Sequence, residues 1–483
     1  MARAGRIVTA AALAVALVGG YGAADAADLV PGVLTTGARP QPPEPFPSPT
    51  GTALEPGTSP VLADLDPQAP GPTDAGLAAA LTGLLDAPEL GPSVSASVVD
   101  VGTGEVLLAR GADVPREPAS LTKLLTGAAA LHALDPAAPL LTRAVLDDQG
   151  RVVLVGGGDV LLAAGAGDPD AVAGRAGLAD LADATARALA ERGTASVTVG
   201  VDTGLFSGAT TSPGWAPGDV SQGFVAPIEP LEVDAGSLGA GRGRDPQPAT
   251  SAARTFAALL AERGLTVVGD VSPASAAADD EELAAVESAP LADVVGYALT
   301  TSDNTVAEAL ARLVAHERGQ PASFTGGTAA VLAELRELAD QVPGSGGTSL
   351  GAVLDLVTLS DGSGLGDGTR IAPATITALL TLAASEQGSR LRPLVTDLPV
   401  AGLTGTLADR FDGTATADAA GLLRAKTGTL TGVTTLGGVV QTEDGRLLAF
   451  AVMADQVPAG GTAAARQAVD AVGAAVAGCG CSG

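Results

Sequence analysis

The sequence predicts an α+β protein, in which helices cover an antiparallel sheet and an α/β lobe is inserted into the chain. Patterns of two strands around a short turn occur near both ends, at 93–110 and 432–455, so we expect strands from both termini to share one sheet. The middle of the chain instead alternates helix and strand patterns. With 46% hydrophobic residues, the chain can bury a large core.

The N-terminal segment predicts export. Arg3 and Arg6 precede an apolar run from Ile7 to Val18, and Ala24-Asp25-Ala26 matches a cleavage pattern. The run is short for a membrane span, so we assign residues 1–27 to a signal peptide. An uncleaved anchor is the alternative, and either reading places the rest of the chain outside the cytoplasm, secreted or held at the cell envelope. Residues 28–74 predict an extended linker, because 12 of the 33 prolines lie between 31 and 74.

The first folded segment, 75–142, predicts an amphipathic helix and then a hairpin that turns at Gly102-Thr103-Gly104. The last segment, 287–478, ends in a hairpin that turns at Asp444-Gly445 and in an apolar helix. We interpret these two segments as one discontinuous catalytic domain. Residues 479–483 hold both cysteines and predict a frayed tail, with a disulfide as the alternative.

The insert between these segments, 143–286, predicts two helix–strand units, at 181–202 and 252–271. Each helix ends in Ala-Glu-Arg-Gly, which places Gly193 and Gly264 at expected helix C-caps. The insert contains none of the motifs described next. We therefore expect a separate folding unit that takes no part in the chemistry.

Charge and composition exclude several function classes. A formal net charge of −28 argues against nucleic acid, whose phosphates require a basic surface. Two cysteines and two distant histidines form no zinc pattern, and no feature of the sequence predicts a metal or another cofactor.

His132 lies 12 residues after Ser120, too far along a helix to be its base, and we expect it and His316 to be surface or packing residues. Trp215, the only tryptophan, predicts a packing anchor or a wall of a substrate groove.

Three short motifs contain every lysine and asparagine of the chain. Ser120 and Lys123 lie one helical turn apart, and a neutral lysine can take the proton that makes a serine hydroxyl nucleophilic. Ser302-Asp303-Asn304 opens another predicted helix; alone, it is better interpreted as a helix N-cap. Lys426-Thr427-Gly428-Thr429 begins the last hairpin; alone, it reads as a solvated lysine on an edge strand. Residue frequencies put their joint occurrence by chance at about one in ten thousand, so together they predict an enzyme active site.

The order Ser-x-x-Lys, Ser-x-Asn, Lys-Thr-Gly resembles that of penicillin-binding proteins and serine β-lactamases. The long insert and the phrases "VLVGGGDVLL", "SDGSGLG" and "AKTGTLTG" make the chain similar to the class C low-molecular-mass penicillin-binding proteins, the D-alanyl-D-alanine carboxypeptidase/endopeptidases. The resemblance implies the penicillin-binding/β-lactamase-like fold, peptidoglycan stem peptides as substrates and β-lactams as covalent inhibitors. Gly366 departs from the family pattern, which has a serine there.

The resemblance also implies a role for each motif residue. Ser120 attacks the carbonyl of the penultimate D-alanine and Lys123 takes its proton, while Ser302 relays a proton to the leaving nitrogen and Asn304 binds the substrate backbone. Lys426 and Thr427 receive the terminal carboxylate. The backbone N–H groups of Ser120 and Thr429 form the oxyanion hole. From the residues themselves, Gly428 predicts close approach of substrate to the strand, and repulsion by Lys426 together with burial predicts a lowered pKa for Lys123.

Two other activities fit the same motifs, and an esterase of the same fold is a lesser alternative. A serine β-lactamase is one alternative, although Asn304 is the only asparagine and the Glu–Asn pair of class A enzymes is therefore absent. A penicillin sensor that is acylated without turnover is the other. Release of D-alanine from a stem-peptide mimic would separate the peptidase from both.

Overall fold

The structure is a computed structural model that describes residue 21 and residues 69–341 and 349–479. The predicted signal peptide, except Tyr21, and the linker up to residue 68 lie outside these residues, as do 480–483. The described residues from 69 onward fall within one compact unit. No helix in the part of the chain that the structure describes is long and apolar enough to cross a membrane.

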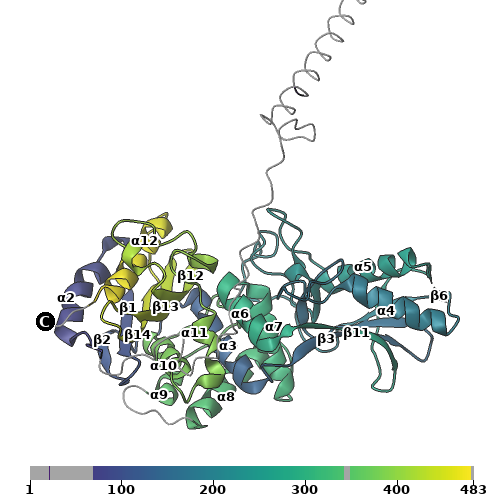
Figure 1. Cartoon of the computed structure of the whole chain (residues 1–483), viewed down its shortest axis with the longest axis horizontal. Coiled ribbons are helices and arrows are strands. Elements are labelled where there is room, and N and C mark those ends of the chain that lie inside the picture. Colours follow the sequence, from purple (N-terminus) through teal and green to yellow (C-terminus); the bar gives the residue numbers. More distant parts are fainter. Residues whose placement is uncertain (1–20, 22–68, 342–348, 480–483) are drawn as a thin grey trace, which may run out of the picture. The chain divides into compact units, whose positions relative to one another are not determined.

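The first sheet joins strands from both ends of the chain, as the sequence predicts. Its order is β12-β13-β14-β1-β2, and each neighbouring pair is antiparallel (Figure 1). Val98 of β1 lies opposite Phe450 of β14, although most of the chain separates them. The predicted α+β class is confirmed. The strands are β1 (Val94–Asp100), β2 (Val106–Arg110), β12 (Leu423–Leu430), β13 (Val433–Gln441) and β14 (Leu447–Ala454).

Strand β14 separates two hydrophobic cores, because successive side chains of a strand point to opposite faces. Leu448, Phe450 and Val452 face a core that includes α2 (Asp74–Leu85) and α12 (Thr462–Ala477). The alternate residues Ala449, Ala451 and Met453 face a larger core that includes α3 (Thr122–Ala133) and α10 (Pro373–Ala384). Cys479 is buried beside α12, which differs from the frayed tail that the sequence predicts at this residue.

Helices supply most of the larger core. The chain passes through α6 (Leu291–Thr301), α7 (Asn304–Glu317), α8 (Phe324–Gln341), α9 (Leu350–Leu354) and α11 (Pro393–Thr396). Helix α3 contacts α6, α7 and α8. Only His132 and Ala133, at its C-terminal end, are not buried, because helices and sheet surround the rest. Two of the three motif segments lie where α3 and α7 begin.

A second sheet is formed within residues 139–290. Its order is β10-β7-β4-β3-β11, with parallel pairs at β10–β7 and β7–β4 and antiparallel pairs at β4–β3 and β3–β11. Helices α4 (Leu178–Glu191) and α5 (Pro248–Glu262) pack beside it, and Gly193 and Gly264 follow them at positive φ, as predicted (Figure 1). The strands are β3 (Pro139–Leu146), β4 (Val152–Val155), β7 (Val199–Asp202), β10 (Ser272–Pro273) and β11 (Glu281–Pro290). Two short pairs accompany it: β5 (Asp159–Leu162) with β8 (Leu231–Val233), and β6 (Ser196–Val197) with β9 (Thr266–Val267).

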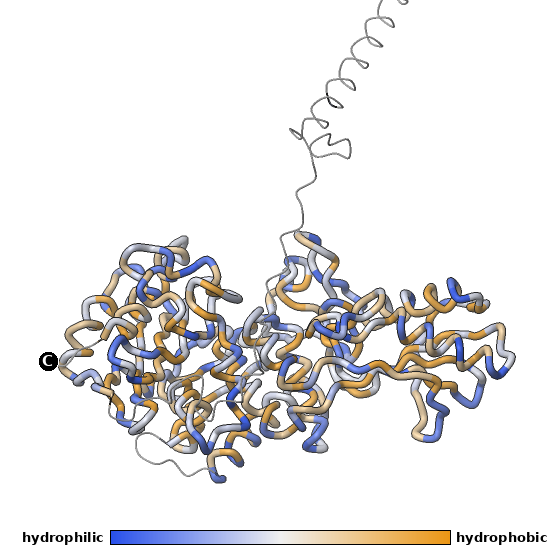
Figure 2. The backbone as a smooth tube through the Cα atoms, in the orientation of Figure 1, coloured by the Kyte–Doolittle hydropathy of each residue, from blue (hydrophilic) through white to orange (hydrophobic). Residues whose placement is uncertain are grey.

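The insert does not stand apart from the helices around α3. The second sheet and its helices have a core of their own, which includes Leu154, Leu181 and Phe256. Other residues of the insert, however, belong to the larger core: Val160, Leu161, Phe206, Trp215, Val225, Ile228 and Ala235. Hydrophobic segments accordingly continue through both regions (Figure 2). The expectation of a separate folding unit does not fit this shared core.

Candidate active site

Ser120 lies in a strained turn that leads into α3. The turn is the 3-10 helix η2 (Ala119–Leu121), and Ala119 has a φ of 48°, a left-handed conformation that costs a non-glycine residue about 1–2 kcal/mol. A Cβ on Gly364 would lie 2.0 Å from the carbonyl oxygen of Ala119, so that glycine packs directly against the turn. The surrounding chain therefore holds Ser120 in place at the start of the helix.

Lys123 lies one turn later and is 2% exposed. Its Nζ lies 2.9 Å from Ser120 Oγ, 2.5 Å from Asn304 Oδ1 and 2.9 Å from the Ser363 carbonyl oxygen. The amide and carbonyl oxygens can only accept hydrogen bonds, whereas the serine hydroxyl can also donate. A neutral amine thus places its two N–H groups on Asn304 and Ser363 and keeps its lone pair for the Ser120 proton.

Burial increases the fraction of Lys123 that is neutral. Burial lowers the pKa of Lys123 to about 8, while the charges of Asp361, Glu308 and Asp303 oppose the shift. The direction is the one that the sequence predicts, but the cause differs in emphasis. Desolvation dominates at Lys123, and the repulsion between the two lysines is felt at Lys426, whose pKa burial and Lys123 hold well below its usual value.

The three side chains of the Ser302-Asp303-Asn304 segment make different contacts. Asp303 is the N-cap of α7, where its Oδ1 accepts a hydrogen bond from the Val306 N–H at 3.1 Å. Ser302 ends α6 in a left-handed conformation with φ of 61°, and its hydroxyl oxygen accepts a hydrogen bond from Lys426. Asn304 faces Lys123. The N-cap interpretation therefore applies to Asp303, and the serine and the asparagine face the lysines.

Lys426 is fully buried on β12, so the solvated edge lysine is excluded. Its Nζ donates to Ser302 Oγ at 2.7 Å and to the Thr427 carbonyl at 2.9 Å. The hydroxyl of Thr427 donates to that of Thr406 at 2.9 Å. Thr429 is exposed further along the same strand. The structure thus brings Ser120, Lys123, Ser302, Asn304 and Lys426 together, with Thr427 beside them.

Gly428 has a different reason to be glycine from the one that the sequence suggests. A Cβ there would lie 2.1 Å from Thr435 Oγ1 and 2.8 Å from the Pro118 carbonyl oxygen. Those two atoms are joined by a hydrogen bond of 2.9 Å, which ties β13 to the residue before η2. The glycine therefore allows β12 to approach the turn that holds Ser120.

Two buried carboxyl groups that the sequence analysis missed hold the 361–366 loop. Glu308 Oε1 accepts the Ser363 N–H at 2.8 Å and Oε2 the Gly362 N–H at 3.0 Å, while Asp361 accepts the Gly364 and Gly366 N–H groups, both at 2.7 Å. Burial and the charge of Asp361 raise the pKa of Glu308 to about 8. The loop turns the Ser363 carbonyl toward Lys123.

The sequence pointed to this loop but not to its contact with Glu308. The phrase "SDGSGLG" marked it, and Glu308 lies one helical turn after Asn304, but no pattern joined the two. At the departure from the family pattern, a Cβ on Gly366 would lie 2.8 Å from Asp361 Oδ2, so a larger residue does not fit this arrangement.

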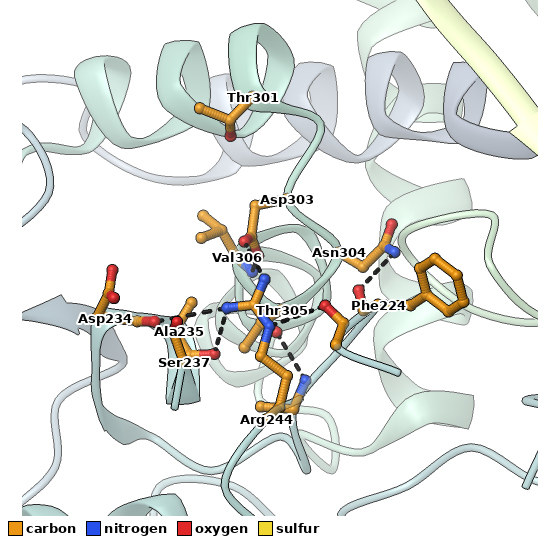
Figure 3. A network of polar contacts seen from close by, with 12 residues as sticks. Phe224, Asp234, Ala235, Ser237, Arg244, Thr301, Asp303, Asn304, Thr305 and Val306 are labelled. Atoms are coloured by element: carbon orange, nitrogen blue, oxygen red, sulfur yellow. Dashed lines mark hydrogen bonds and ion pairs between the residues drawn. The ribbon is translucent and has the colours of Figure 1, made fainter. Parts of the chain in front are cut away.

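The insert contacts the site in three places, contrary to expectation. Trp215 Nε1 donates to Asp361 Oδ2 at 3.0 Å, and its ring packs edge-on against Phe324 with centroids 5.1 Å apart, which makes it the predicted packing anchor. The Phe224 carbonyl accepts a hydrogen bond from Asn304 Nδ2 at 2.8 Å, and Arg244 forms an ion pair with Asp303 (Figure 3). Neither contact could be read from a motif, because Phe224 and Arg244 both lie outside the helices and strands of the insert.

The histidines lie away from Ser120, as predicted. His132 Nδ1 lies 2.5 Å from Glu334 Oε1 on α8, and His316 is exposed on α7. Lysine, and not histidine, is the base candidate next to the serine.

The family described as "D-Ala-D-Ala carboxypeptidase 3 (S13)" matches residues 77–241 and 243–476. The chain belongs to this family. It is 40% identical over 442 residues to carboxypeptidase DacB of Mycolicibacterium smegmatis, covering 90% of either chain. It is 38% identical over 446 residues to a carboxypeptidase of Mycobacterium tuberculosis, covering 91% of this chain and 90% of that one.

Solved structures agree on the fold. Penicillin binding protein 4 of Haemophilus influenzae superposes with a TM-score of 0.63 at 21% identity, over 78% of this chain and 93% of that one. The resemblance drawn from the three motifs is confirmed, and the chain is a serine peptidase of the S13 family.

Replacing Gly428 with alanine tests the contact between β12 and the Ser120 turn in this S13 peptidase. The added methyl group displaces the Pro118–Thr435 hydrogen bond and shifts Ser120 relative to Lys426, so we expect acylation by a fluorescent penicillin to slow on the order of 100-fold. Gly83→Ala is the control, since a Cβ at Gly83 meets nothing within 4 Å. In the α2 helix it should raise the free energy of unfolding by about 0.5–1 kcal/mol and leave acylation unchanged. Equal acylation rates in the two variants would contradict this account.

Proposed function

We propose that this chain is an exported D,D-carboxypeptidase that removes the terminal D-alanine of peptidoglycan stem peptides through an acyl-enzyme on Ser120. The observation that carries the proposal is the buried Lys123 amine, which contacts Ser120 Oγ and two oxygens that can only accept. Membership of the S13 family supplies the substrate class.

Acylation begins with the Ser120 hydroxyl. Its proton moves to the neutral amine of Lys123 as Oγ attacks the carbonyl carbon of the penultimate D-alanine. The developing oxyanion is stabilised by the backbone N–H groups of Ser120 and Thr429. The new ammonium then donates to Asn304 and Ser363, both of which already accept from Nζ, so little reorganisation is required.

Departure of D-alanine requires a proton on its nitrogen. Ser302 is suited to relay to it the proton that Lys123 took from Ser120, because the Ser302 hydroxyl can donate its own proton to the nitrogen and take that one in its place. A hydrogen bond from Lys426 holds the Ser302 oxygen. Lys426 and Thr427 receive the terminal carboxylate of the substrate. Asn304 uses one amide N–H on Phe224 and retains the other for the substrate backbone.

The location follows from the substrate. Stem peptides lie in the cell wall, so the chain acts outside the cytoplasm. Residues 1–27 would direct export, and β-lactams, which resemble the D-alanyl-D-alanine end of the substrate, would acylate Ser120 as covalent inhibitors.

Release of D-alanine tests the function directly. The wild-type protein should release free D-alanine from a peptide ending in D-Ala-D-Ala and release nothing from the matching D-Ala-L-Ala peptide. Ser120→Ala should abolish release and penicillin labelling, whereas Ser196→Ala, at an exposed serine of β6, should alter neither. Labelling without release would favour the penicillin sensor, and labelling that survives Ser120→Ala would move the nucleophile elsewhere.

The pH dependence of acylation tests Lys123 as the base. A lysine acts as a base only when neutral, so the rate should rise with pH and reach half its maximum near the pKa of about 8 that burial gives Lys123. Lys123→Arg retains the charge but cannot lose a proton, and acylation should fall by about 10²–10⁴-fold. Stopped-flow labelling with a fluorescent penicillin measures both. Acylation of Lys123→Arg within a few-fold of wild type would exclude this role.

Substrates without a free carboxylate test Lys426. Lys426→Met removes the amine while keeping most of the volume of this buried side chain. We expect it to lower kcat/KM more for the carboxylate peptide than for its C-terminal amide, by a factor equivalent to about 2–4 kcal/mol, since only the former loses the partner of its carboxylate. Equal losses on both peptides would show that Lys426 serves the proton transfer and not carboxylate recognition.

A further inference from the structure

Arg244 belongs to the insert, yet its guanidinium group reaches the start of α7. It donates through Nη2 to Asp303 Oδ2 at 3.1 Å, through Nε to the Gly223 carbonyl at 3.1 Å and through Nη1 to the Ala235 carbonyl at 2.9 Å. Figure 3 shows the guanidinium between Asp303 and Ala235, with Asn304 and the Phe224 carbonyl on the other side of the α7 start. The ion pair is mostly buried, with 17% of the arginine side chain and 10% of the aspartate side chain exposed.

The insert contacts three consecutive residues at this point. Arg244 contacts Asp303, the Phe224 carbonyl accepts from Asn304, and the Ala226 N–H donates to Thr305 Oγ1 at 2.9 Å. Arg244 thereby links Asp303 to the segment that contacts Asn304, because the Gly223 carbonyl that Arg244 binds immediately precedes Phe224. The position of the Phe224 carbonyl in turn orients the Asn304 amide, whose Oδ1 faces Lys123.

The insert holds Arg244 in place at a conformational cost. Asp234 and Ala235 both have positive φ, 48° and 49°, which costs non-glycine residues about 1–2 kcal/mol each. Arg244 Nη1 binds the Ala235 carbonyl at this strained turn, and the Arg244 N–H donates to the Val220 carbonyl at 3.0 Å. Such strain persists where the surrounding contacts over-determine the conformation, and these contacts lead to the active site.

We infer that Arg244 is a positioning residue for the acylation step, which it controls by fixing the Asn304 amide against Lys123 and by neutralising the Asp303 carboxylate beside them. The inference rests on the proposed function, since it assumes that Lys123 is the base. It assigns to the insert a part in the chemistry of a site to which it contributes none of the three motifs.

Burial and the neighbouring charges act on Lys123 in opposite directions. Asp303, Glu308 and Asp361 favour the charged form of Lys123, whereas burial favours the neutral form. The Lys426 amine lies close by, and burial together with Lys123 holds the pKa of Lys426 well below its usual value. Around Asp303 itself, Arg244 is the counter-charge. The charges of Asp303 and Arg244 also act on two neighbouring groups, the buried carboxyl group of Glu232 and the phenol of Tyr297. Asp303 raises the pKa of both, and Arg244 lowers it. Removing Arg244 leaves the Asp303 anion uncompensated, which raises the pKa of Lys123 and reduces the neutral fraction at pH 7.

The experiment compares four variants by acylation rate against pH, with a fluorescent penicillin as the probe. Arg244→Met should slow acylation on the order of 10- to 100-fold at pH 7 and move the midpoint of the pH profile upward. Asp303→Asn should move the midpoint downward, and because asparagine is as good an N-cap as aspartate, α7 should remain intact. The double variant should fall between the two.

Arg263→Met is the matched control. Arg263 forms an ion pair with Asp183, donates to the Leu259 and Ala179 carbonyls and has 19% of its side chain exposed, but these contacts join α4 to α5 within the insert. Its loss should lower the melting temperature as Arg244→Met does and leave the pH midpoint in place.

Two outcomes would overturn the inference. One is an Arg244→Met protein that acylates within threefold of wild type with an unchanged midpoint; the other is a slowing no larger than that of Arg263→Met. If Arg244→Met does not fold, an unmoved midpoint in Asp303→Asn has the same force. Failure of the proposed function is distinguishable, because the wild-type protein would then fail to label on Ser120 or would not require Lys123.

Discussion

The active site depends on one buried amine that must find acceptors. Burying the Lys123 side chain removes its hydration, and a buried polar group without partners costs about 1–3 kcal/mol or more. Its three hydrogen-bond partners come from the turn before α3, from the first residue of α7 and from the loop at 361–366. Elements that are far apart in the sequence are thus brought to one nitrogen, and the need to satisfy that nitrogen fixes where they lie.

The Ser363 carbonyl and the Ser120 turn are themselves held in place by further contacts. The Ser363 carbonyl depends on Glu308 and Asp361, which bind the backbone N–H groups on either side of it. On the opposite side, β12 approaches the Ser120 turn only because Gly428 has no side chain, and this approach places Lys426 against Ser302. The two lysines therefore face the ends of one short segment, 302–304, which explains why a single turn between α6 and α7 carries two motif residues.

How much could be predicted from the sequence depended on distance along the chain. The Ser120–Lys123 pair follows from helix periodicity, and the sheet from hairpins at both ends. Ser302, Asn304 and Lys426 were found because lysine and asparagine are so rare here that each occurrence was informative. Glu308 could not be distinguished from a surface glutamate, because its partners lie more than 50 residues away, and Arg244 was one of 24 arginines. The contacts of the insert were missed for the same reason, since irregular segments carry no periodic signal.

The core shared by the insert and the helices also bears on how this protein could change over time. Phe206, Trp215, Val225 and Ile228 pack with α3, α7 and α8, the helices that surround the Lys123 amine. A domain joined to the rest of the protein only by its two polypeptide connections could be exchanged as a whole between relatives, or lost altogether. Here its removal would open an apolar surface beside the catalytic helix. Substitutions in the insert and in these helices are therefore expected to accumulate in pairs, so that the two regions change together and are inherited as a unit.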